Sequence, residues 1–259
     1  MSPPRYSVVM PVYNKGPHLH RSVSSVLRQS ETDFELIIVD DASTDDGVRQ
    51  VEAMDDPRVR VLHRDGPGPG ASPARNLGVA NAAGAWLTFL DADDEWRDDF
   101  LRTVTEAREA FPDACMVSTG WIKKEPGGAR SENAYYRAHH ARGPHAYRLG
   151  EYLANATRGA IPVWTSVAAV DRATLVAAGG FPEGEHALRG EDEDTWLRIM
   201  LEGGQAAWAP GPGATYHRDA VNRITRKEVP VLLRVPLVQT LTARLAVEAE
   251  PEIRSALRA

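Results

Sequence analysis

The stretch FELIIVDD, residues 34–41, indicates how this chain folds. Residues 34–39 form an almost continuous apolar run, which is typical of a strand buried on both faces in the middle of a sheet. Another apolar run, residues 6–10, precedes it and ends at a proline, and residues 58–63 follow with the alternation of a strand nearer an edge. Between the first two strands, residues 17–29 carry an apolar helical face made by Leu19, Val23, Val26 and Leu27. This alternation predicts βαβ units and an α/β fold with a mostly parallel central sheet flanked by helices.

Glycine, proline and serine mark the approach to the fourth strand. The segment GPGPGA, residues 66–71, cannot form a regular element. Ser72 and Pro73 then favour a helix start, with serine as the N-cap and proline at the first helical position. We expect this helix to run to about residue 83 and Gly84 to close it.

Three carboxylates follow the fourth predicted strand, residues 85–90, within four positions: Asp91, Asp93 and Asp94. Their oxygens would converge on one small volume, which suits hard divalent ions that keep open positions for phosphate. An isolated Asp-x-Asp is more often a solvated loop, so the neighbouring strand ends decide between the two interpretations.

The ends of the other strands offer a pocket for a nucleotide. Ligands of open α/β sheets bind beyond the carboxyl ends of the strands, where these residues would meet. Pro11, Tyr13 and Asn14 supply a rigid turn, an aromatic ring and an amide, while Asp41 could accept hydrogen bonds from a base or ribose. Arg75 follows on the next helix. Half-buried packing of Tyr13 and a turn at Asp41 are the ordinary alternatives.

Beyond residue 98 the alternation becomes less regular. Residues 123–150 are polar, rich in glycine, histidine and arginine, and are expected to form a long excursion. Strands are expected at residues 114–118, 163–170, 206–209 and 214–217, and helices at residues 100–111, 172–178, 196–201 and from residue 229 onward.

A second acidic cluster, residues 191–194 (EDED), precedes the helix at residues 196–201. One of these acids could serve as a general base, although acids also belong in the first turn of a helix, where they complement its dipole. His217 could ligate a metal through neutral imidazole, but a lone histidine at a strand end is more often only hydrogen-bonded. Trp164 could stack on a sugar ring or be an ordinary core residue.

Composition limits the function and the compartment. The net charge of −6 argues against a general nucleic-acid binder. The single cysteine, Cys115, can form no internal disulfide, so a reducing compartment is expected. The first residues lead directly into a strand and contain no signal peptide or membrane span. We therefore expect a cytoplasmic protein.

Five linked motifs, between about residues 5 and 220, resemble glycosyltransferase family 2, the inverting enzymes with a GT-A fold. They occur in the family's order: SVVMPVYN at residues 7–14, IIVDDASTD at residues 37–45, ARNLG at residues 74–78, FLDADD at residues 89–94, and GGF with GED at residues 179–181 and 190–192. Five motifs at family spacing are far more specific than any one of them.

The resemblance implies a role for each matching residue. The nucleotide site would consist of Pro11, Tyr13, Asn14, Asp41, Arg75 and Asp91. Asp93 would bind Mn²⁺ or Mg²⁺ directly, and His217 would complete the metal shell. Asp192 would be the general base, with Glu191 beside it. Residues 1–110 would then bind the nucleotide-sugar, residues 111–220 the acceptor and base, and residues 221–259 would be a helical extension of the same domain.

The resemblance also implies a donor and an acceptor. The donor would be a nucleotide-diphospho-sugar, commonly UDP-linked, and the acceptor a carbohydrate or lipid-linked glycan used for cell-surface polysaccharide or glycoconjugate synthesis. The Gln-x-x-Arg-Trp signature of processive synthases is missing, and Trp196-Leu197-Arg198 stands in its place, so transfer of a single sugar is expected. The C-terminal helix could pack on the body, join a second subunit or rest on the inner face of a membrane; its three glutamates at residues 248–252 favour packing.

Three alternatives compete with this interpretation. A nicotinamide-dependent oxidoreductase would need G-x-G-x-x-G after the first strand, where PVYN stands. A sugar-nucleotide nucleotidyltransferase would show a glycine-rich loop with a basic residue there. A protein of the same fold that binds a nucleotide-sugar or a partner chain without turnover would not need to retain both Asp93 and Asp192.

Overall fold

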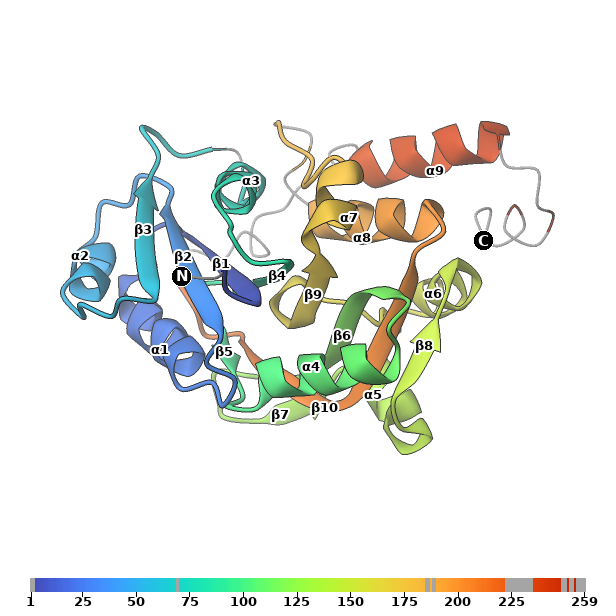
Figure 1. Ribbon diagram of the computed structural model, residues 1–259, viewed down its shortest axis with the longest axis horizontal. Helices are drawn as coiled ribbons and strands as arrows, with labels where there is room; N and C mark the ends of the chain where they lie inside the picture. Colours follow the sequence, from blue (N-terminus) through green and yellow to red (C-terminus); the bar gives the residue numbers. More distant parts are fainter. Residues whose placement is uncertain are drawn as a thin grey trace.

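The strands of the protein form a single mixed sheet (Figure 1). The computed structural model describes residues 3–68, 70–184, 187, 190–221, 235–247, 251 and 254. The strands are β1 Tyr6–Val12, β2 Phe34–Asp40, β3 Val59–His63, β4 Trp86–Phe89, β5 Glu95–Trp96, β6 Ala114–Lys124, β7 Arg130–Glu132, β8 His145–Tyr147, β9 Ala168–Asp171 and β10 Gln205–His217. Their order is β3-β2-β1-β4-β9-β6-β10-β5, with β7 paired to β6 and β8 to β10.

Helices cover both faces of this sheet (Figure 1). They are α1 Gly16–Leu27, α2 Gly47–Glu52, α3 Ser72–Ala80, α4 Phe100–Ala110, α5 Ala134–His139, α6 Leu149–Ala156, α7 Arg172–Ala177, α8 Glu191–Leu201 and α9 Val235–Val247, with 3₁₀ turns η1 His140–Arg142 and η2 Thr165–Val167. Apolar residues of α1, α2 and α4 pack in one core cluster, and those of α3, α6, α7 and α8 pack in the other. The expected α/β fold is confirmed.

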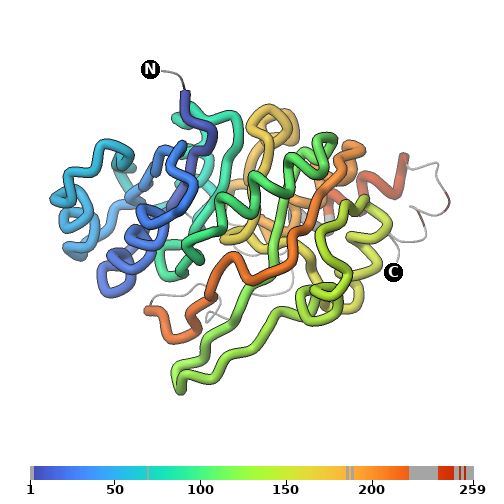
Figure 2. Tube along the Cα trace, turned by 60° about the horizontal axis from the view of Figure 1, so that its bottom comes forward, coloured from blue at the N-terminus to red at the C-terminus, as the bar shows by residue number. Residues whose placement is uncertain are grey.

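The direction of the strands places the site. The strands β3, β2, β1 and β4 are parallel to their neighbours, so β1, β2 and β4 end at one edge of the sheet. The next strand, β9, is antiparallel to both β4 and β6, while β6 and β10 are again parallel. Figure 2 shows that the end of β10 returns to the N-terminal half and lies beside α1. Residues far apart in sequence therefore meet at the edge where β1, β2 and β4 end.

Alternation along β1 explains why it lies at the centre. Val8 and Met10 contribute to the core cluster shared with α1, and Val9 contributes to the cluster shared with α3. All three are fully buried, which stabilises the fold by about 1.5–3 kcal/mol for each side chain. On the α3 side, a Cβ added to Gly78 would lie 2.4 Å from Cγ1 of Val9, so only glycine permits this close approach of helix and strand.

Several predicted boundaries near the N-terminus were wrong. β1 continues through Pro11 to Val12, because its pairing with β4 ends at Val9 and the proline removes no donor needed on that side. Ser72 is the first residue of α3 and not its N-cap, which is Ala71. The same helix ends at Ala80, and Gly84 instead allows the backbone to approach Ser7, whose N would lie 2.6 Å from an added Cβ.

The C-terminal half also differs from its prediction. The expected strand at residues 163–170 is a 3₁₀ turn, η2, followed by β9, because Thr165 and Ser166 turn their hydroxyls towards other elements. The two strands expected at residues 206–209 and 214–217 are one strand, β10, with register shifts around Pro212. The excursion at residues 123–150 contains β7, α5, η1 and β8, and reaches the start of α6.

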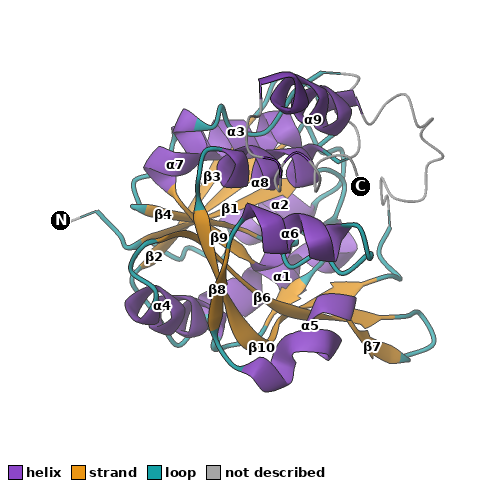
Figure 3. Ribbon diagram, turned by 90° about the vertical axis from the view of Figure 1, so that its right-hand side faces the viewer, coloured by secondary structure: helices purple, strands orange, loops and turns teal. Residues whose placement is uncertain are grey.

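The C-terminal helix packs on the body. Leu241 and Leu245 of α9 contact the core cluster that contains α8, and Thr240 Oγ1 donates to Asp194 Oδ1 at 2.6 Å. Figure 3 shows α9 on the same side of the sheet as α3 and α8. The helix was expected from residue 229; residues 229–234 lie outside the described residues. Within the part of the chain that the structure describes, no helix is both long and apolar enough to cross a bilayer.

Candidate active site

The loops after β1 and β2 are locked together at the edge of the sheet. Asn14 and Ala42 adopt left-handed backbone conformations, with φ of 51° and 60°, which non-glycine residues rarely do outside constrained sites. Asn14 Oδ1 accepts from Thr44 N at 2.7 Å, and Asn14 N donates to Ser43 Oγ at 3.0 Å. Beside them, the Tyr13 side chain is 44% exposed, which leaves a flat aromatic ring available at this edge.

Asp41 is buried under the glycine-proline loop. Its carboxylate accepts from the Arg64 guanidinium and from the backbone N–H of Gly68, at 3.1 and 3.2 Å to its two oxygens. A Cβ added at Gly68 would lie 2.7 Å from Arg64 NH1, so the loop approaches this ion pair closely. The arrangement holds loop 66–71 against the end of β2.

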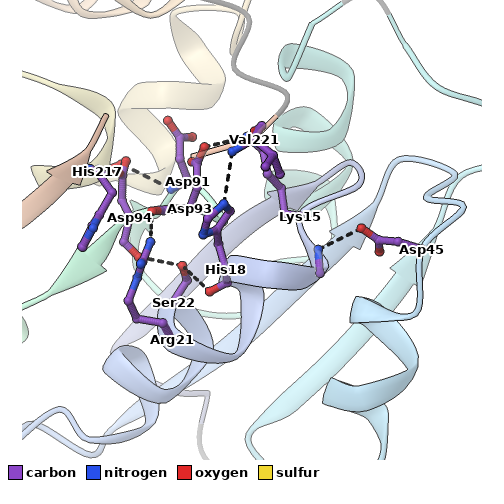
Figure 4. Close-up of polar contacts among 12 residues, drawn as sticks. Lys15, His18, Arg21, Ser22, Asp45, Asp91, Asp93, Asp94, His217 and Val221 are labelled. Atoms are coloured by element: carbon purple, nitrogen blue, oxygen red, sulfur yellow. Dashed lines mark hydrogen bonds and ion pairs between the residues drawn. The ribbon is translucent and has the colours of Figure 1, made fainter. Parts of the chain in front are cut away.

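Asp93 lies at the start of α1, as predicted for the strand-end carboxylates, and is held there by two cationic side chains (Figure 4). Lys15 Nζ donates to Asp93 Oδ2 at 2.6 Å, and Arg21 NH2 donates to the Asp93 carbonyl at 2.6 Å. Lys15 Nζ also donates to the carbonyl of Val221 at 2.8 Å, and the N–H of Val221 donates to His18 Nε2 at 3.1 Å. Lys15, at the N-terminus of α1, thus connects the Asp93 carboxylate to Val221, which follows β10, and His18 of α1 binds Val221 as well.

Asp94 is structural. Its side chain is fully buried and accepts from Ser166 Oγ at 3.0 Å and from His217 N at 3.2 Å, while its carbonyl accepts from Ser22 Oγ at 2.6 Å. Burial, with the nearby charges of Asp93 and Asp91, raises the pKa of Asp94 well above its usual range. Through these three hydrogen bonds Asp94 connects α1, η2 and β10 at the end of β4.

Arg75 joins the two acidic clusters. From α3 it donates to Asp91 Oδ1 at 2.8 Å and to Glu191 Oε1 at 3.2 Å. Although burial opposes its charge, the carboxylates of Asp91, Glu191 and Asp192 raise the pKa of this arginine. Burial and repulsion from Asp192 raise the pKa of Glu191 to about 7, and Arg75 counteracts this shift. A fully buried guanidinium thus brings the end of β4 and the start of α8 into one site.

The acids at the start of α8 have separate roles. Asp192 Oδ2 accepts from Thr165 Oγ1 at 2.8 Å. This hydrogen bond directs the Asp192 carboxylate, in the first turn of α8, towards η2. Asp194 accepts from Arg198 at 2.7 Å and from Thr240, so it stabilises the helix and its contact with α9. Glu191 is bound by Arg75 of α3 and Asp192 by Thr165 of η2, so these two acids connect α8 with the elements around the end of β4.

The structure does not bring the His217 ring to the Asp93 carboxylate. The ring is buried, with Nε2 3.3 Å from Glu95 Oε2 and Nδ1 3.9 Å from Asp219 Oδ1. Burial and the charge of Arg21 lower the pKa of His217, which favours neutral imidazole. Its backbone N–H, which binds Asp94, connects it to the acidic strand end.

The residues fit a divalent ion that is held jointly with phosphate. Among the described residues, no three of His, Cys, Asp and Glu gather around one point. Mg²⁺ and similar ions are commonly held by one or two carboxylates plus substrate phosphates, so such a cluster is not required. Asp93 already binds a cation, the Lys15 ammonium, at 2.6 Å. This carboxylate can therefore hold a metal ion when a diphosphate supplies the other oxygens.

Sequence reasoning missed most of the residues that hold this site. Lys15, His18, Arg21 and Ser22 all come from α1, whose predicted role was only its apolar face. Apart from its apolar face, α1 carries polar residues at helical spacing, and that pattern could have signalled a second contact surface. Thr165 and Ser166 were hidden within a predicted strand.

The family comparison agrees with this geometry. The model of the glycosyl transferase family 2 matches residues 7–160, more than half of the chain. The chain belongs to glycosyl transferase family 2. The matched region contains β1, β2, β4 and their loops, and therefore four of the five motifs on which the sequence resemblance rests; the fifth, at residues 179–181 and 190–192, lies beyond it.

Two relatives named as glycosyltransferases each align with about two fifths of the chain. "Glycosyltransferase GlyG" of Streptococcus pneumoniae is 41% identical over 100 residues, 38% of this chain and 33% of that protein. "Putative teichuronic acid biosynthesis glycosyltransferase TuaG" of Bacillus subtilis is 41% identical over 106 residues, 40% of this chain and 41% of that protein. The chain thus aligns with well under half of each relative's length.

Solved structures show the same GT-A fold. A structure of Staphylococcus aureus TarS in complex with UDP-GlcNAc superposes with a TM-score of 0.80 at 16% identity, covering 100% of this chain and 72% of that one. Mannosyltransferase PcManGT from Pyrobaculum calidifontis, in complex with GDP-Man and Mn²⁺, gives 0.59 at 21% identity, covering 97% and 78%. These likenesses establish the fold of the family 2 chain.

Proposed function

We propose that this family 2 glycosyltransferase moves one sugar from a UDP-linked donor to an acceptor hydroxyl with inversion, using Mn²⁺ or Mg²⁺. The observation that carries the proposal is the Arg75 bridge, which joins Asp91 after β4 to Glu191 at the start of α8, one residue from Asp192. A donor-binding carboxylate set and a candidate base thereby share one edge of the sheet. The relatives TuaG, named for teichuronic acid biosynthesis, and ExoO, named for succinoglycan biosynthesis, support a role in cell-surface polysaccharide synthesis.

The donor would occupy the ends of β1, β2 and β4. Tyr13 offers an exposed ring for the base, and Asp41 would meet the base beside the loop that contains Gly68. Asp91 would contact the ribose, and the hydrogen bond from Arg75 would orient its carboxylate. The UDP-GlcNAc complex of TarS supports a UDP-linked donor. The GDP-Man complex of PcManGT supports the alternative, a GDP-linked donor, and a panel of donors distinguishes the two.

The leaving diphosphate requires positive charge. Asp93 would hold Mn²⁺ or Mg²⁺, which when bound neutralises the charge that develops on the departing diphosphate. Lys15, which now neutralises Asp93, would move to the phosphates or to solvent as the ion binds. His217 stays a proposed additional ligand that would have to exchange its contact with Glu95.

Asp192 would take the proton from the acceptor hydroxyl. Thr165 Oγ1 donates to Asp192 Oδ2 at 2.8 Å and the Glu193 backbone N–H donates to Asp192 Oδ1 at 2.9 Å, so both bonds fix the direction of the carboxylate that would accept the proton. Attack from the face opposite the diphosphate inverts the anomeric centre in a single displacement, so no covalent sugar intermediate forms. In this scheme residues 1–110 supply the donor site, and residues 111–220 supply the base.

Calorimetric titration with UDP tests the donor site. We expect Mn²⁺ to strengthen UDP binding to the wild type by about tenfold or more, ~1.4 kcal/mol, and Asp93→Asn to remove this gain. Asp98→Asn is the matched control, because it removes an equal charge whose carboxylate pairs with Arg28 at the opposite end of α1 from Lys15, and its side chain is 66% exposed. The donor site is misassigned if UDP binds equally well with and without Mn²⁺ in the wild type and in Asp93→Asn.

A further inference from the structure

Three aromatic rings from different parts of the chain contact one another. Trp121 lies on β6, Trp164 immediately precedes η2, and Tyr216 lies near the end of β10. The ring centroids of Trp121 and Trp164 are 5.5 Å apart with an interplanar angle of 44°, and those of Trp164 and Tyr216 are 5.2 Å apart at 65°. We call Trp121, Trp164 and Tyr216 the aromatic trio.

The register of the sheet sets the trio on one face. In the parallel pair β6–β10, Trp121 is opposite Ala214, and Tyr216 is opposite Lys123, two residues beyond Trp121. Residues two apart on a strand share a face, so Trp121 and Tyr216 project from the same side, where Trp164 joins them. The trio is therefore a surface built jointly by the sheet and the segment before η2.

Chain neighbours tie the trio to the reaction centre at both ends. Thr165, next to Trp164, donates to the proposed base Asp192 at 2.8 Å. His217, next to Tyr216, donates its backbone N–H to Asp94 in the acidic strand end at 3.2 Å. Trp164 is thus next in the chain to the residue that binds the proposed base, and Tyr216 is next to the residue that binds the structural Asp94, which follows Asp93.

The trio lies at the margin of the core, where Trp121 and Trp164 pack against the cluster that contains α1. Its three side chains are each only partly buried. Within the described part of the chain, the indole N–H groups of Trp121 and Trp164 donate to no protein acceptor. The buried Trp96, by contrast, donates Nε1 to the carbonyl of Ser166 at 2.7 Å. The trio therefore offers the exposed part of its ring surface, together with two indole donors, to a bound molecule.

We propose that the aromatic trio is the acceptor platform and that the acceptor it selects is a pyranose-containing glycan. The proposal rests on the proposed function. One face of a pyranose ring carries mainly C–H groups and matches an aromatic face, while its hydroxyls can accept from the indole edge. An acyclic polyol presents no such flat apolar face, so the platform discriminates against it.

The experiment measures donor turnover with simple acceptors. UDP release from the best donor, with Mn²⁺, is followed at rising concentrations of methyl hexopyranosides, methyl 2-acetamido-hexopyranosides and ribitol. We expect a pyranoside to accelerate release and ribitol to have no effect. Trp164→Leu and Trp121→Leu should each raise the acceptor KM about tenfold with the donor KM unchanged, and Trp164→Phe, which keeps a ring, should remain within about threefold of wild type.

Controls separate this proposal from the proposed function. Trp86→Leu removes a tryptophan that lies against Arg108 at the opposite end of the sheet, and it should leave the acceptor KM unchanged. Saturation-transfer NMR with the same pyranosides needs no turnover and should show binding that Trp164→Leu abolishes. An unchanged KM in both leucine variants, equal use of ribitol, or no pyranoside binding to the wild type overturns the platform, while failure of every donor to release a nucleotide overturns the proposed function.

Discussion

Replacement of Asp192 by asparagine should lower kcat by about 10²–10⁴, because an amide cannot accept the proton of the acceptor hydroxyl. Asparagine keeps the size of the side chain, and its oxygen can still accept from Thr165, so the fold and the helix start should survive. Donor binding should change little, since the donor is held at the ends of β1, β2 and β4. The measurement is steady-state release of the nucleoside diphosphate in the presence of acceptor, together with donor affinity.

Glu193→Gln is the matched control for this prediction. Glu193 lies one residue further along the same first turn of α8, so its replacement removes an equal charge from the same helix terminus. We expect kcat to remain within about threefold of wild type. If Asp192→Asn transfers sugar as fast as wild type, Asp192 is not the base.

The largest expected effect on stability comes from Arg75→Met. The change leaves Asp91 and Glu191 without their shared guanidinium, and the loss of one partner of a buried ion pair costs about 3–5 kcal/mol. The side chain of Asp91 is 32% exposed and that of Glu191 is 15% exposed, so the cost should lie near the lower end and arise mainly from Glu191. Urea unfolding measures it, against a total stability on the order of 5–15 kcal/mol.

A control variant and a double variant test whether the loss of stability comes from the buried ion pair. Arg60→Met removes an arginine that is 47% exposed and pairs with Glu35, and it should cost less than about 1 kcal/mol. The double variant Arg75→Met with Glu191→Gln should regain part of the loss, because the stranded charge is gone. If Arg75→Met unfolds at the same urea concentration as wild type, the buried bridge does not hold the site together.

The N-terminal half of the fold was predictable because each of its strands has a local pattern, a mainly apolar run in β1, β2 and β4 and alternation in β3. The run at residues 34–39 indicated a doubly covered strand, and β2 spans Phe34–Asp40 with both core clusters beside it. The strand ends then followed from the polar residues after each run. For the same reason, the meeting of Asp41, Asp91 and Asp93 at one edge could be predicted without coordinates.

The C-terminal half was less predictable because its strands depend on partners distant in sequence. The segment at residues 163–170 has the composition of a strand, but two hydroxyl contacts, of Thr165 with Asp192 and of Ser166 with Asp94, pull its first part into a 3₁₀ turn. Local patterns contain no information about such contacts. The antiparallel insertion of β9 between β4 and β6 was invisible for the same reason.

Within the site, sequence motifs located the carboxylates but not what neutralises them. Arg75 was predicted near the nucleotide, and the structure shows that it binds Asp91 and Glu191, a bridge that the motifs did not predict. Lys15 was not expected at all, although it forms the ion pair with Asp93. A motif fixes which acids a site contains, whereas the identity of their partners depends on how α1, α3 and α8 pack against the sheet.

The most direct test of the central claim is turnover of a panel of UDP-, GDP- and dTDP-linked sugars by the wild-type protein with Mn²⁺, scored by release of the nucleoside diphosphate. We predict that at least one UDP-linked sugar is turned over, that EDTA stops the release, and that Asp192→Asn slows it without loss of donor binding. If none of the donors is bound or turned over with the metal present, the acidic strand end is not a donor site and the proposed function is wrong.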